Sequence, residues 1–357
     1  MPLSAGATAF IAKANKALKE DLLVPAELLA VPVRFTTGSP SADVILGGGL
    51  PGNQWTEVVG KASAGKTFFA LKSIAANQRL DPNFTTLWIA AETYNHEWAE
   101  ALGVDNERVV VVPTMQMEKG LQVILEGLES AEFDCIVLDS FPAMVPDEEL
   151  AKAMDEFTTA IGARTFGKFF RKAGESGRRP YDGSGRPFYG IFINQYRDKI
   201  GGFARFGTPQ TTPGGNAKDY FCYARIEVSR KDWITEKRPG IKDPVHVGQI
   251  NIFKTIKNKS AAPQQRVEVP LYFRRAPSLG FDRGDYDTAV EYFTMGRLLR
   301  IISMGGGGYY TFGDHRWHGE DAVLADIRQD AGLQLQLRAE VMEAAADPRR
   351  LDEFEVV

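Results

Sequence analysis

The octapeptide GKASAGKT, residues 60–67, holds the first side chains of this chain whose spacing suggests chemistry. It matches the pattern G-x-x-x-x-G-K-[ST], follows the apolar run TEVVG and opens the helical pattern KTFFALKSIAANQRL. The glycines let backbone N–H groups wrap closely around phosphates, and a helix N-terminus favours an anion. We expect Lys66 to reach the β- and γ-phosphates of a nucleotide and the Thr67 hydroxyl to ligate Mg²⁺. The expected nucleotide-binding residues of this loop are Gly60, Lys61, Ala62, Ser63, Ala64, Gly65, Lys66 and Thr67.

Polar residues end three other apolar runs. CIVLDS ends in Asp139 and Ser140, LWIAAE ends in Glu92, and FYGIFINQ ends in Gln195. Because ligands bind at the carboxyl ends of parallel strands, we expect these side chains beside the phosphate-binding loop. Asp139 is expected to hold Mg²⁺ through water, Glu92 to polarise the attacking water, and Gln195 to contact the γ-phosphate. A cap of the following turn is the alternative for Asp139, and an ordinary surface position is the alternative for Glu92.

The stretch GGFARFGTPQTTPGGN, residues 201–216, follows the Gln195 run and is too long for an ordinary connection. Structureless loops beyond about 12–15 residues are usually functional or disordered. If Gln195 senses the γ-phosphate, nucleotide can order this loop and hydrolysis can release it. Its glycines and small polar residues suit a nucleic-acid backbone, its cations supply charge, and its phenylalanines can stack on bases. A surface loop without a ligand is the alternative.

The composition is that of a globular protein, since 44% of the 357 residues are hydrophobic, 25% are charged and the net charge is −4. No global basic field indicates nucleic acid, but residues 164–205 contain ten Lys or Arg against three acids. This basic stretch is explained either by a local anionic partner or by a solvated charged face. Cys135 and Cys222 make neither a disulfide framework nor a metal site, which indicates a reducing compartment. We find no signal peptide and no membrane span in the sequence, and expect a cytoplasmic protein without a membrane partner.

Apolar runs alternate with helical patterns through the first half of the chain. Runs that are apolar throughout indicate parallel strands covered by helices on both faces, at residues 56–60, 85–92, 108–113, 135–140 and 188–195. Beyond residue 220 three further runs predict hairpin strands that extend the sheet, and one last helix is expected over residues 320–346. We therefore predict an α/β fold in three parts. These are an N-terminal oligomerisation helix and linker (residues 1–34), a core with a mainly parallel central sheet and DNA-binding loops (35–275), and a small C-terminal α/β domain (276–357).

Together these motifs resemble those of the RecA family of ATP-dependent DNA recombinases, from about residue 35 to 335. The segments that carry the resemblance are TTGSPSADVILGGGLP, GKASAGKT, IVLDS, FINQYRDKIG, FGTPQTTPGGNA and KNKSAAP. The resemblance implies a P-loop RecA-like core with ATP and Mg²⁺ as cofactors. It implies a DNA-dependent ATPase that forms a helical filament of its own copies on single-stranded DNA and exchanges strands with a homologous duplex. It also implies single-strand-binding or loader proteins as partners, and the weaker similarity at both ends is common in phage-encoded relatives, which act in the cytoplasm of an infected host.

The resemblance assigns roles to single residues. Glu92 matches the catalytic carboxylate of the family and Gln195 its allosteric glutamine. Lys257 and Lys259 of KNKSAAP match lysines that reach a neighbouring subunit's ATP and stabilise transition-state charge, a solvated turn being the alternative. Trp98 is expected to stack on the adenine, and Tyr272 is also expected to bind the nucleotide. Tyr220, Phe10 and Ile11 are expected at the subunit interface, where a core position is the alternative for Tyr220.

The resemblance also implies two DNA-binding loops. The first lies near EELAKAMDEFTT, residues 148–159, and the second is TTPGGNA. The expected DNA-binding residues are Arg164, Arg171, Arg197, Lys199, Ile200, Phe206, Gly214, Gly215 and Asn216.

The chain departs from the family pattern in several places. One residue is missing before Trp98, which leaves Asn95 and His96 as alternatives facing the base. The basic stretch at residues 172–190 is longer than its counterpart and is either an added DNA or partner contact or a surface insertion. GGFARFG is also longer, so Phe203 competes with Phe206, and the first loop lacks the usual glycine.

Two other functions share this kind of core. A ring helicase is expected to use an arginine in trans, where this chain has KNK, and to carry an N-terminal collar domain. An accessory of the branch-migration type is expected to carry a Cys-rich zinc module, which two distant cysteines exclude. A nucleotide-gated DNA-binding protein without strand exchange stays the main alternative.

Overall fold

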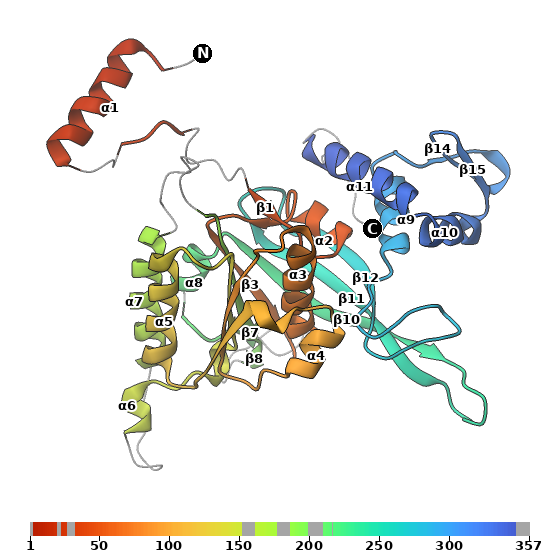
Figure 1. Ribbon diagram of the computed structural model, residues 1–357, viewed down its shortest axis with the longest axis horizontal. Helices are drawn as coiled ribbons and strands as arrows, with labels where there is room; N and C mark the ends of the chain where they lie inside the picture. The colour runs from red at the N-terminus through yellow and green to blue at the C-terminus, as the bar shows by residue number, and fades with distance from the viewer. Residues whose placement is uncertain are drawn as a thin grey trace.

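The computed structural model describes residues 3–19, 23–26, 33–151, 161–176, 186–198, 210–215 and 217–347. At its centre lies an eight-stranded sheet in the order β12-β11-β10-β3-β7-β6-β4-β5 (Figure 1). The five runs predicted as parallel strands form β3 (Gln54–Gly60), β4 (Thr86–Ala90), β5 (Val109–Pro113), β6 (Cys135–Asp139) and β7 (Tyr189–Gln195). They pair in parallel with one another, so the predicted mainly parallel α/β core is confirmed.

The three runs predicted as hairpin strands also extend this sheet. β10 (Ala224–Glu236) pairs in parallel with β3 over residues 224–227 only, and β11 (Val245–Asn258) and β12 (Arg266–Tyr272) follow in antiparallel order. β10 and β11 continue together beyond β3 as a long hairpin at the lower right of Figure 1.

Helices cover both faces of the sheet. α3 (Lys66–Leu80) and α4 (His96–Ala101) lie on one face, and α5 (Met117–Ser130), α7 (Ile161–Ser176) and α8 (Ala217–Phe221) lie on the other. Successive side chains of a strand point to opposite faces, which explains why Ile191 packs in the α3 core and Phe192 in the α5–α7 core. At the end of each strand, neighbouring side chains therefore point to opposite faces of the sheet.

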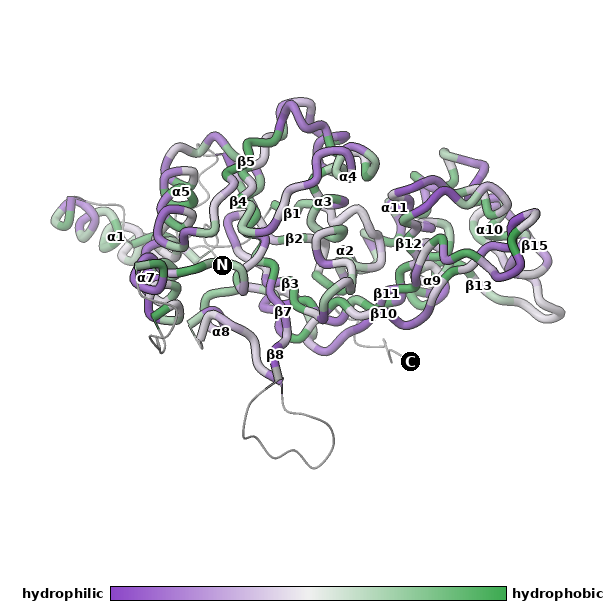
Figure 2. The backbone as a smooth tube through the Cα atoms, turned by 90° about the horizontal axis from the view of Figure 1, so that it is seen from below, coloured by the Kyte–Doolittle hydropathy of each residue, from purple (hydrophilic) through white to green (hydrophobic). Residues whose placement is uncertain are grey.

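The N-terminal part contributes α1 (Ala5–Leu18), the short pair β1 (Arg34–Phe35) and β2 (Leu50–Pro51), and α2 (Pro40–Ile45). No residue of α1 is buried, and α1 and α10 lie toward opposite ends of the molecule (Figure 2). The other short elements are η2 (Asn106–Arg108), η3 (Phe141–Ala143), α6 (Asp147–Leu150), β8 (Arg197–Asp198) and β9 (Gln210–Thr211). None of the described helices is both long and apolar enough to cross a bilayer.

The C-terminal part has a hydrophobic core of its own, around Phe312, Trp317 and Leu337. Its elements are α9 (Thr288–Leu298), β13 (Ser303–Met304), η4 (Gly306–Gly308), β14 (Tyr309–Phe312), β15 (His315–His318), α10 (Glu320–Gln329) and α11 (Ala331–Ala346). The prediction of one last helix over residues 320–346 is wrong, because the chain breaks at Asp330, with φ −107° and ψ 101°. The Asp330 carboxylate accepts hydrogen bonds from the backbone N–H groups of Gly332 and Leu333 at 2.8 and 3.0 Å. Aspartate is a poor residue in a helix interior and a good N-cap, which accounts for the break.

Candidate nucleotide and DNA site

The phosphate-binding loop joins the end of β3 to the start of α3. A Cβ atom at Gly60 would lie 2.2 Å from the carbonyl oxygen of Val228, so only glycine fits there. Gly65 has φ +99°, and a Cβ atom on it would lie 2.7 Å from Nδ2 of Asn251. Gly65 is also the N-cap of α3 and supplies no side-chain cap. The first N–H groups of α3 are therefore left without a side-chain partner from the cap, as an anion site requires.

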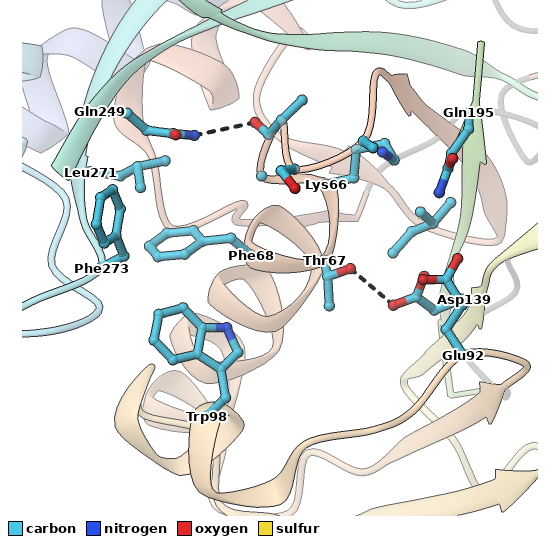
Figure 3. Close-up of a pocket in the computed structure, with 15 residues that line it drawn as sticks. Lys66, Thr67, Phe68, Glu92, Trp98, Asp139, Gln195, Gln249, Leu271 and Phe273 are labelled. Atoms are coloured by element: carbon cyan, nitrogen blue, oxygen red, sulfur yellow. Dashed lines mark hydrogen bonds between the residues drawn. The ribbon is translucent and has the colours of Figure 1, made fainter. Parts of the chain in front are cut away.

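A cavity of about 410 Å³ opens in front of this loop (Figure 3). Lys66 and Thr67 line it together with Glu92, Asp139 and Gln195, so the structure brings together the site residues expected from four separate segments. The rest of the expected loop residues divide into two groups. Ala62, Ser63, Ala64 and Gly65 line the cavity, whereas Gly60 and Lys61 do not line it.

The polar end of the cavity holds one cation opposite two carboxylates. Lys66 is only 6% exposed, and its ammonium donates to the carbonyl of Lys61 at 2.7 Å. Burial lowers the pKa of Lys66, while Asp139 and Glu92 act in the opposite direction. Burial and the nearby Glu92 raise the pKa of Asp139 to about 6.

The hydrogen bonds at this end link the carboxylates to hydroxyl groups. The Thr67 hydroxyl donates to Oδ2 of Asp139 at 3.0 Å, and the buried Ser140 hydroxyl donates to Glu92. A hydroxyl and a carboxylate at this spacing fit a Mg²⁺ ion that keeps several waters. Across the described ranges no group of three or more His, Cys, Asp or Glu could enclose a metal, so phosphate oxygens would complete such a site.

The opposite end of the cavity is aromatic and apolar. Trp98 lies there with Phe68, at 6.4 Å between ring centroids, and with Leu271, Phe273 and the amide of Gln249 (Figure 3). An adenine base would fit between such rings. This end agrees with the position expected for Trp98.

Asn95 and His96, considered for the base, and Tyr272, expected at the nucleotide, do not line the cavity. Asn95 caps α4 by accepting the Trp98 N–H at 2.8 Å, and the carbonyl of His96 accepts from Asn106 at 3.0 Å. The ring of Tyr272 stacks on Phe281, with centroids 4.1 Å apart, on the other side of β12. Strand alternation explains the difference, because Leu271 and Phe273 share the face that Tyr272 does not.

Sequence reasoning missed Phe273, Gln249 and Asn251. Gln249 donates to Oδ1 of Asn251 at 2.7 Å, and Asn251 donates to the carbonyl of Ala64 at 3.0 Å. These two buried amides therefore tie the phosphate-binding loop to β11. Side chains alternate between the two faces of β11 and β12, and this alternation could be predicted from the sequence. It does not tell which face lies against the phosphate-binding loop.

Of the expected DNA-binding residues that the structure describes, Arg197, Gly214 and Gly215 follow β7, whereas Arg164 and Arg171 lie on α7. β8 pairs with β9, with Arg197 opposite Thr211, and this pair closes the base of the segment between them. Gly214 and Gly215 have φ of +101° and +67°, conformations that favour glycine. Arg164, Arg171 and Arg197 are exposed, while Lys199, Ile200, Phe203, Phe206, Asn216 and residues 152–160 and 177–185 lie outside the described residues.

The expected interface residues are mostly exposed. Phe10 and Tyr220 are 64% and 80% exposed, Ile11 is half-buried, and Lys259 is exposed. Lys257 differs, because its ammonium donates to backbone carbonyls at the end of α8, among them that of Cys222 at 2.6 Å. The roles expected for all these residues stay predictions.

Comparison with known proteins was made on the whole chain. The family model of the RecA N-terminal domain matches residues 25–277. The chain belongs to the RecA family. It is 30% identical to Protein RecA of Acidothermus cellulolyticus over 88% of this chain and 85% of that protein. It is 31% identical to Protein RecA of Salinispora tropica, over 86% and 82%, and 30% identical to that of Deinococcus radiodurans, over 87% and 79%.

The resemblance inferred from the motifs is thus confirmed, and RecA-family membership implies nucleotide binding and a role in recombination and DNA repair. For the family in general it implies a DNA-dependent ATPase. The cavity in front of residues 60–67 is where such an activity would reside in this RecA-family chain.

Proposed function

We propose that this protein is a DNA-dependent ATPase that assembles on single-stranded DNA with ATP and Mg²⁺ and exchanges strands with a homologous duplex. One observation carries the proposal. The cavity joins Lys66, Thr67, Asp139 and Glu92 to Gln195, whose strand continues directly into the segment that ends at Gly214 and Gly215. Sequence specificity then comes from base pairing between strands, while the protein holds backbones.

The chain's own residues divide the chemistry among them. The loop amides and Lys66 bind and orient the phosphates, and Glu92 polarises the water that attacks the γ-phosphate. Thr67 and Asp139 would hold Mg²⁺, which would supply positive charge against the phosphates. Trp98, Phe68 and Phe273 enclose the base.

Self-assembly is the second part of the proposal. The exposed apolar side of α1 around Phe10 and the exposed Tyr220 suit contacts with adjacent copies. Lys257 and Lys259 would then reach the nucleotide of a neighbour and make hydrolysis depend on assembly. A heterologous interface that does not close gives a helical filament.

The test measures ATP hydrolysis without DNA, with single-stranded DNA and with duplex DNA, at two salt concentrations. We expect strong stimulation by single strands, suppression of that stimulation by salt, and loss of activity in Glu92→Gln. Glu100→Gln, an exposed carboxylate on α4 outside the cavity, is the matched control and should hydrolyse ATP normally. Hydrolysis that ignores DNA contradicts the proposal, and stimulation without homologous strand exchange leaves a ring helicase or a nucleotide-gated DNA-binding accessory protein.

A further inference from the structure

The last two residues of β7 face opposite sides of the sheet. Gln195 and Ile193 line the nucleotide cavity, whereas Asn194 is fully buried on the face that carries Phe192. The two residues are joined, because the backbone N–H of Gln195 donates to Oδ1 of Asn194 at 2.9 Å. The side chain of Asn194 therefore fixes the backbone of the residue proposed to sense the γ-phosphate.

The amide nitrogen of Asn194 makes two more hydrogen bonds on the far side of the sheet. Nδ2 donates to Oε1 of Glu57 at 2.7 Å and to the carbonyl of Pro213 at 3.0 Å. Pro213 lies between β9 and the two glycines at 214 and 215, in the described end of the second loop. Both N–H groups of this buried amide donate and its oxygen accepts one hydrogen bond. Asn194 thus contacts both the proposed nucleotide sensor and the end of the loop.

Glu57 extends this network to the helix that follows the loop. It is 1% exposed on β3, and its second oxygen is paired with Arg225, the residue directly opposite on β10. Arg225 also contacts Asp219 of α8 at 2.9 Å. Since removing one member of a buried ion pair is strongly destabilising, Glu57 is a fixed acceptor against which Asn194 is held.

A role limited to filling the core would explain only part of this arrangement. Burial of an asparagine requires hydrogen-bond partners, and Glu57 alone would satisfy one of its donors. The contacts with Gln195 and Pro213 instead connect two residues that lie 18 positions apart in the chain. One is proposed to contact the nucleotide, and the other lies in the loop proposed to bind DNA.

From this geometry we infer that Asn194 is a positioning residue that transmits the state of Gln195 to the loop end at residues 210–215. A shift of the Gln195 backbone toward the γ-phosphate moves the amide of Asn194, which moves Pro213 and the glycines behind it. The inference rests on the proposed function, since it supplies the link between ATP and DNA that the function requires. It describes coupling between two sites and is measured as a ratio of affinities.

Asn194→Asp tests the link with little change in size. The new carboxyl group can still accept from the Gln195 N–H, but it lacks the two N–H donors of asparagine, and a proton that it shares with Glu57 leaves the Pro213 carbonyl without a donor. Affinity for a fluorescein-labelled oligothymidylate is measured by anisotropy, with Mg²⁺ and either AMP-PNP or no nucleotide. We expect the ratio of the two affinities to fall by about tenfold or more, the usual scale of coupling between sites, while direct AMP-PNP binding is unchanged.

A double variant separates the loop contact from the contact with Glu57. In Asn194→Asp with Glu57→Gln, the new amide at position 57 donates to the new carboxylate at position 194, while the carbonyl of Pro213 still lacks its donor. We expect the double variant to be more stable than Asn194→Asp, because two buried carboxylates no longer face each other, but less stable than the wild type, because Arg225 loses its charged partner Glu57. The affinity ratio should not recover. This variant also carries the test if Asn194→Asp alone does not fold. Thr86→Val, an equally buried polar residue on β4 that lines no part of the cavity, should keep the wild-type ratio.

The outcomes separate the two proposals. A wild-type protein whose DNA affinity ignores AMP-PNP overturns the proposed function, and the coupling with it. A wild-type response that survives in Asn194→Asp, or returns in the double variant, overturns the role of Asn194 alone. A loss of AMP-PNP binding in proportion to the loss of DNA binding does the same, because Asn194 would then act only on the nucleotide cavity.

Discussion

The Thr67 hydroxyl donates a hydrogen bond to Oδ2 of Asp139 at 3.0 Å and so joins the first turn of α3 to the end of β6. Asp139→Asn keeps the size of this side chain and removes its charge. We expect kcat for ATP hydrolysis to fall by about 10²-fold, the scale of losing one electrostatic contact to the transition state. Steady-state hydrolysis measured over a Mg²⁺ titration should also show a higher half-saturating Mg²⁺ concentration.

The pH dependence of the Mg²⁺ titration tests the proposed contact between Asp139 and the metal. The pKa of Asp139 is raised to about 6, so a proton competes with Mg²⁺ for the carboxylate below that pH. In the wild type the half-saturating Mg²⁺ concentration should rise as the pH falls through about 6, and in Asp139→Asn it should not. Asp314→Asn, an exposed position in the C-terminal part, should behave as the wild type. A wild-type profile that is flat between pH 5 and 8 would exclude Asp139 from the metal site.

Phe273 is predicted to hold the base of the nucleotide. It lines the cavity with Trp98 and Phe68, whereas the neighbouring Tyr272 stacks on Phe281 outside it. Loss of one ring from a base-stacking site costs about 1–3 kcal/mol, so Phe273→Ala should weaken ATP binding by about fivefold to 150-fold. Binding of a fluorescent ATP analogue measures this effect.

Tyr272→Phe is the matched control for Phe273→Ala. It keeps the ring that stacks on Phe281 and removes only the hydroxyl, so nucleotide affinity should not change. An equal loss of affinity in the two variants would mean that the Tyr272 hydroxyl contacts the nucleotide, as its expected cofactor-binding role requires, and that Phe273 is not specific to the base.

Local sequence was enough to predict the chemistry of the cavity's polar end. The loop at residues 60–67 and the strand ends at Glu92, Asp139 and Gln195 could be predicted because a buried parallel strand brings its last residue to one known edge. The sequence pattern alone also predicted the five parallel strands and the hairpin extension.

The parts that could not be predicted depend on contacts between distant segments. Phe273 and Tyr272 are both aromatic and adjacent, and only the packing of β12 decides which one faces the cavity. By sequence Asn194 is an ordinary residue of a buried strand, because its proposed role depends on its contact with Pro213, 19 positions later. The break at Asp330 was missed because the apolar pattern continues on both sides of it.

Lys257 is predicted to stabilise α8 in the isolated subunit. Its ammonium donates to the carbonyls of Asp219, Tyr220 and Cys222, which are the orphan acceptors of a helix C-terminus. Lys257→Met should lower the free energy of unfolding by about 1–2 kcal/mol, as expected for hydrogen bonds from a charged group. Hydrogen exchange should increase at residues 217–223.

Lys259→Met is the control for this effect. Lys259 is exposed, and its ammonium lies 5.7 Å from the ring of Tyr223 without a carbonyl partner that the structure describes. Lys259→Met should leave the free energy of unfolding and the hydrogen exchange of residues 217–223 unchanged. If both lysines act on a neighbour's nucleotide, both variants should lower DNA-stimulated ATP hydrolysis. Unchanged exchange in Lys257→Met would show that the α8 contact contributes nothing to the isolated subunit.

Glu291 makes stability depend on pH at the junction between α9 and α2. It is fully buried, one oxygen accepts from the Ser39 hydroxyl and from the Ser41 N–H at 3.0 Å, and the other has no hydrogen-bond partner among the described residues. Burial raises the pKa of Glu291 to about 8, and the facing carboxylate of Asp43 adds to the shift. Glu291 is therefore mainly protonated at neutral pH.

The direction of the pH effect follows from proton binding in the two states. The folded pKa of Glu291 is about 8 and its ordinary value is 4.5, so between these values the folded state binds more protons and the free energy of unfolding falls as the pH rises. The pKa of Asp43 is raised only to about 6, so above that pH the slope from this pair belongs to Glu291. From pH 6.5 to 8 the expected loss is about 1.5 kcal/mol. Glu291→Gln, neutral at every pH, should remove this slope in urea unfolding curves, whereas Glu343→Gln on the exposed side of α11 should retain it. Equal slopes in the wild type and Glu291→Gln would mean that Glu291 is already ionised in the folded protein at neutral pH.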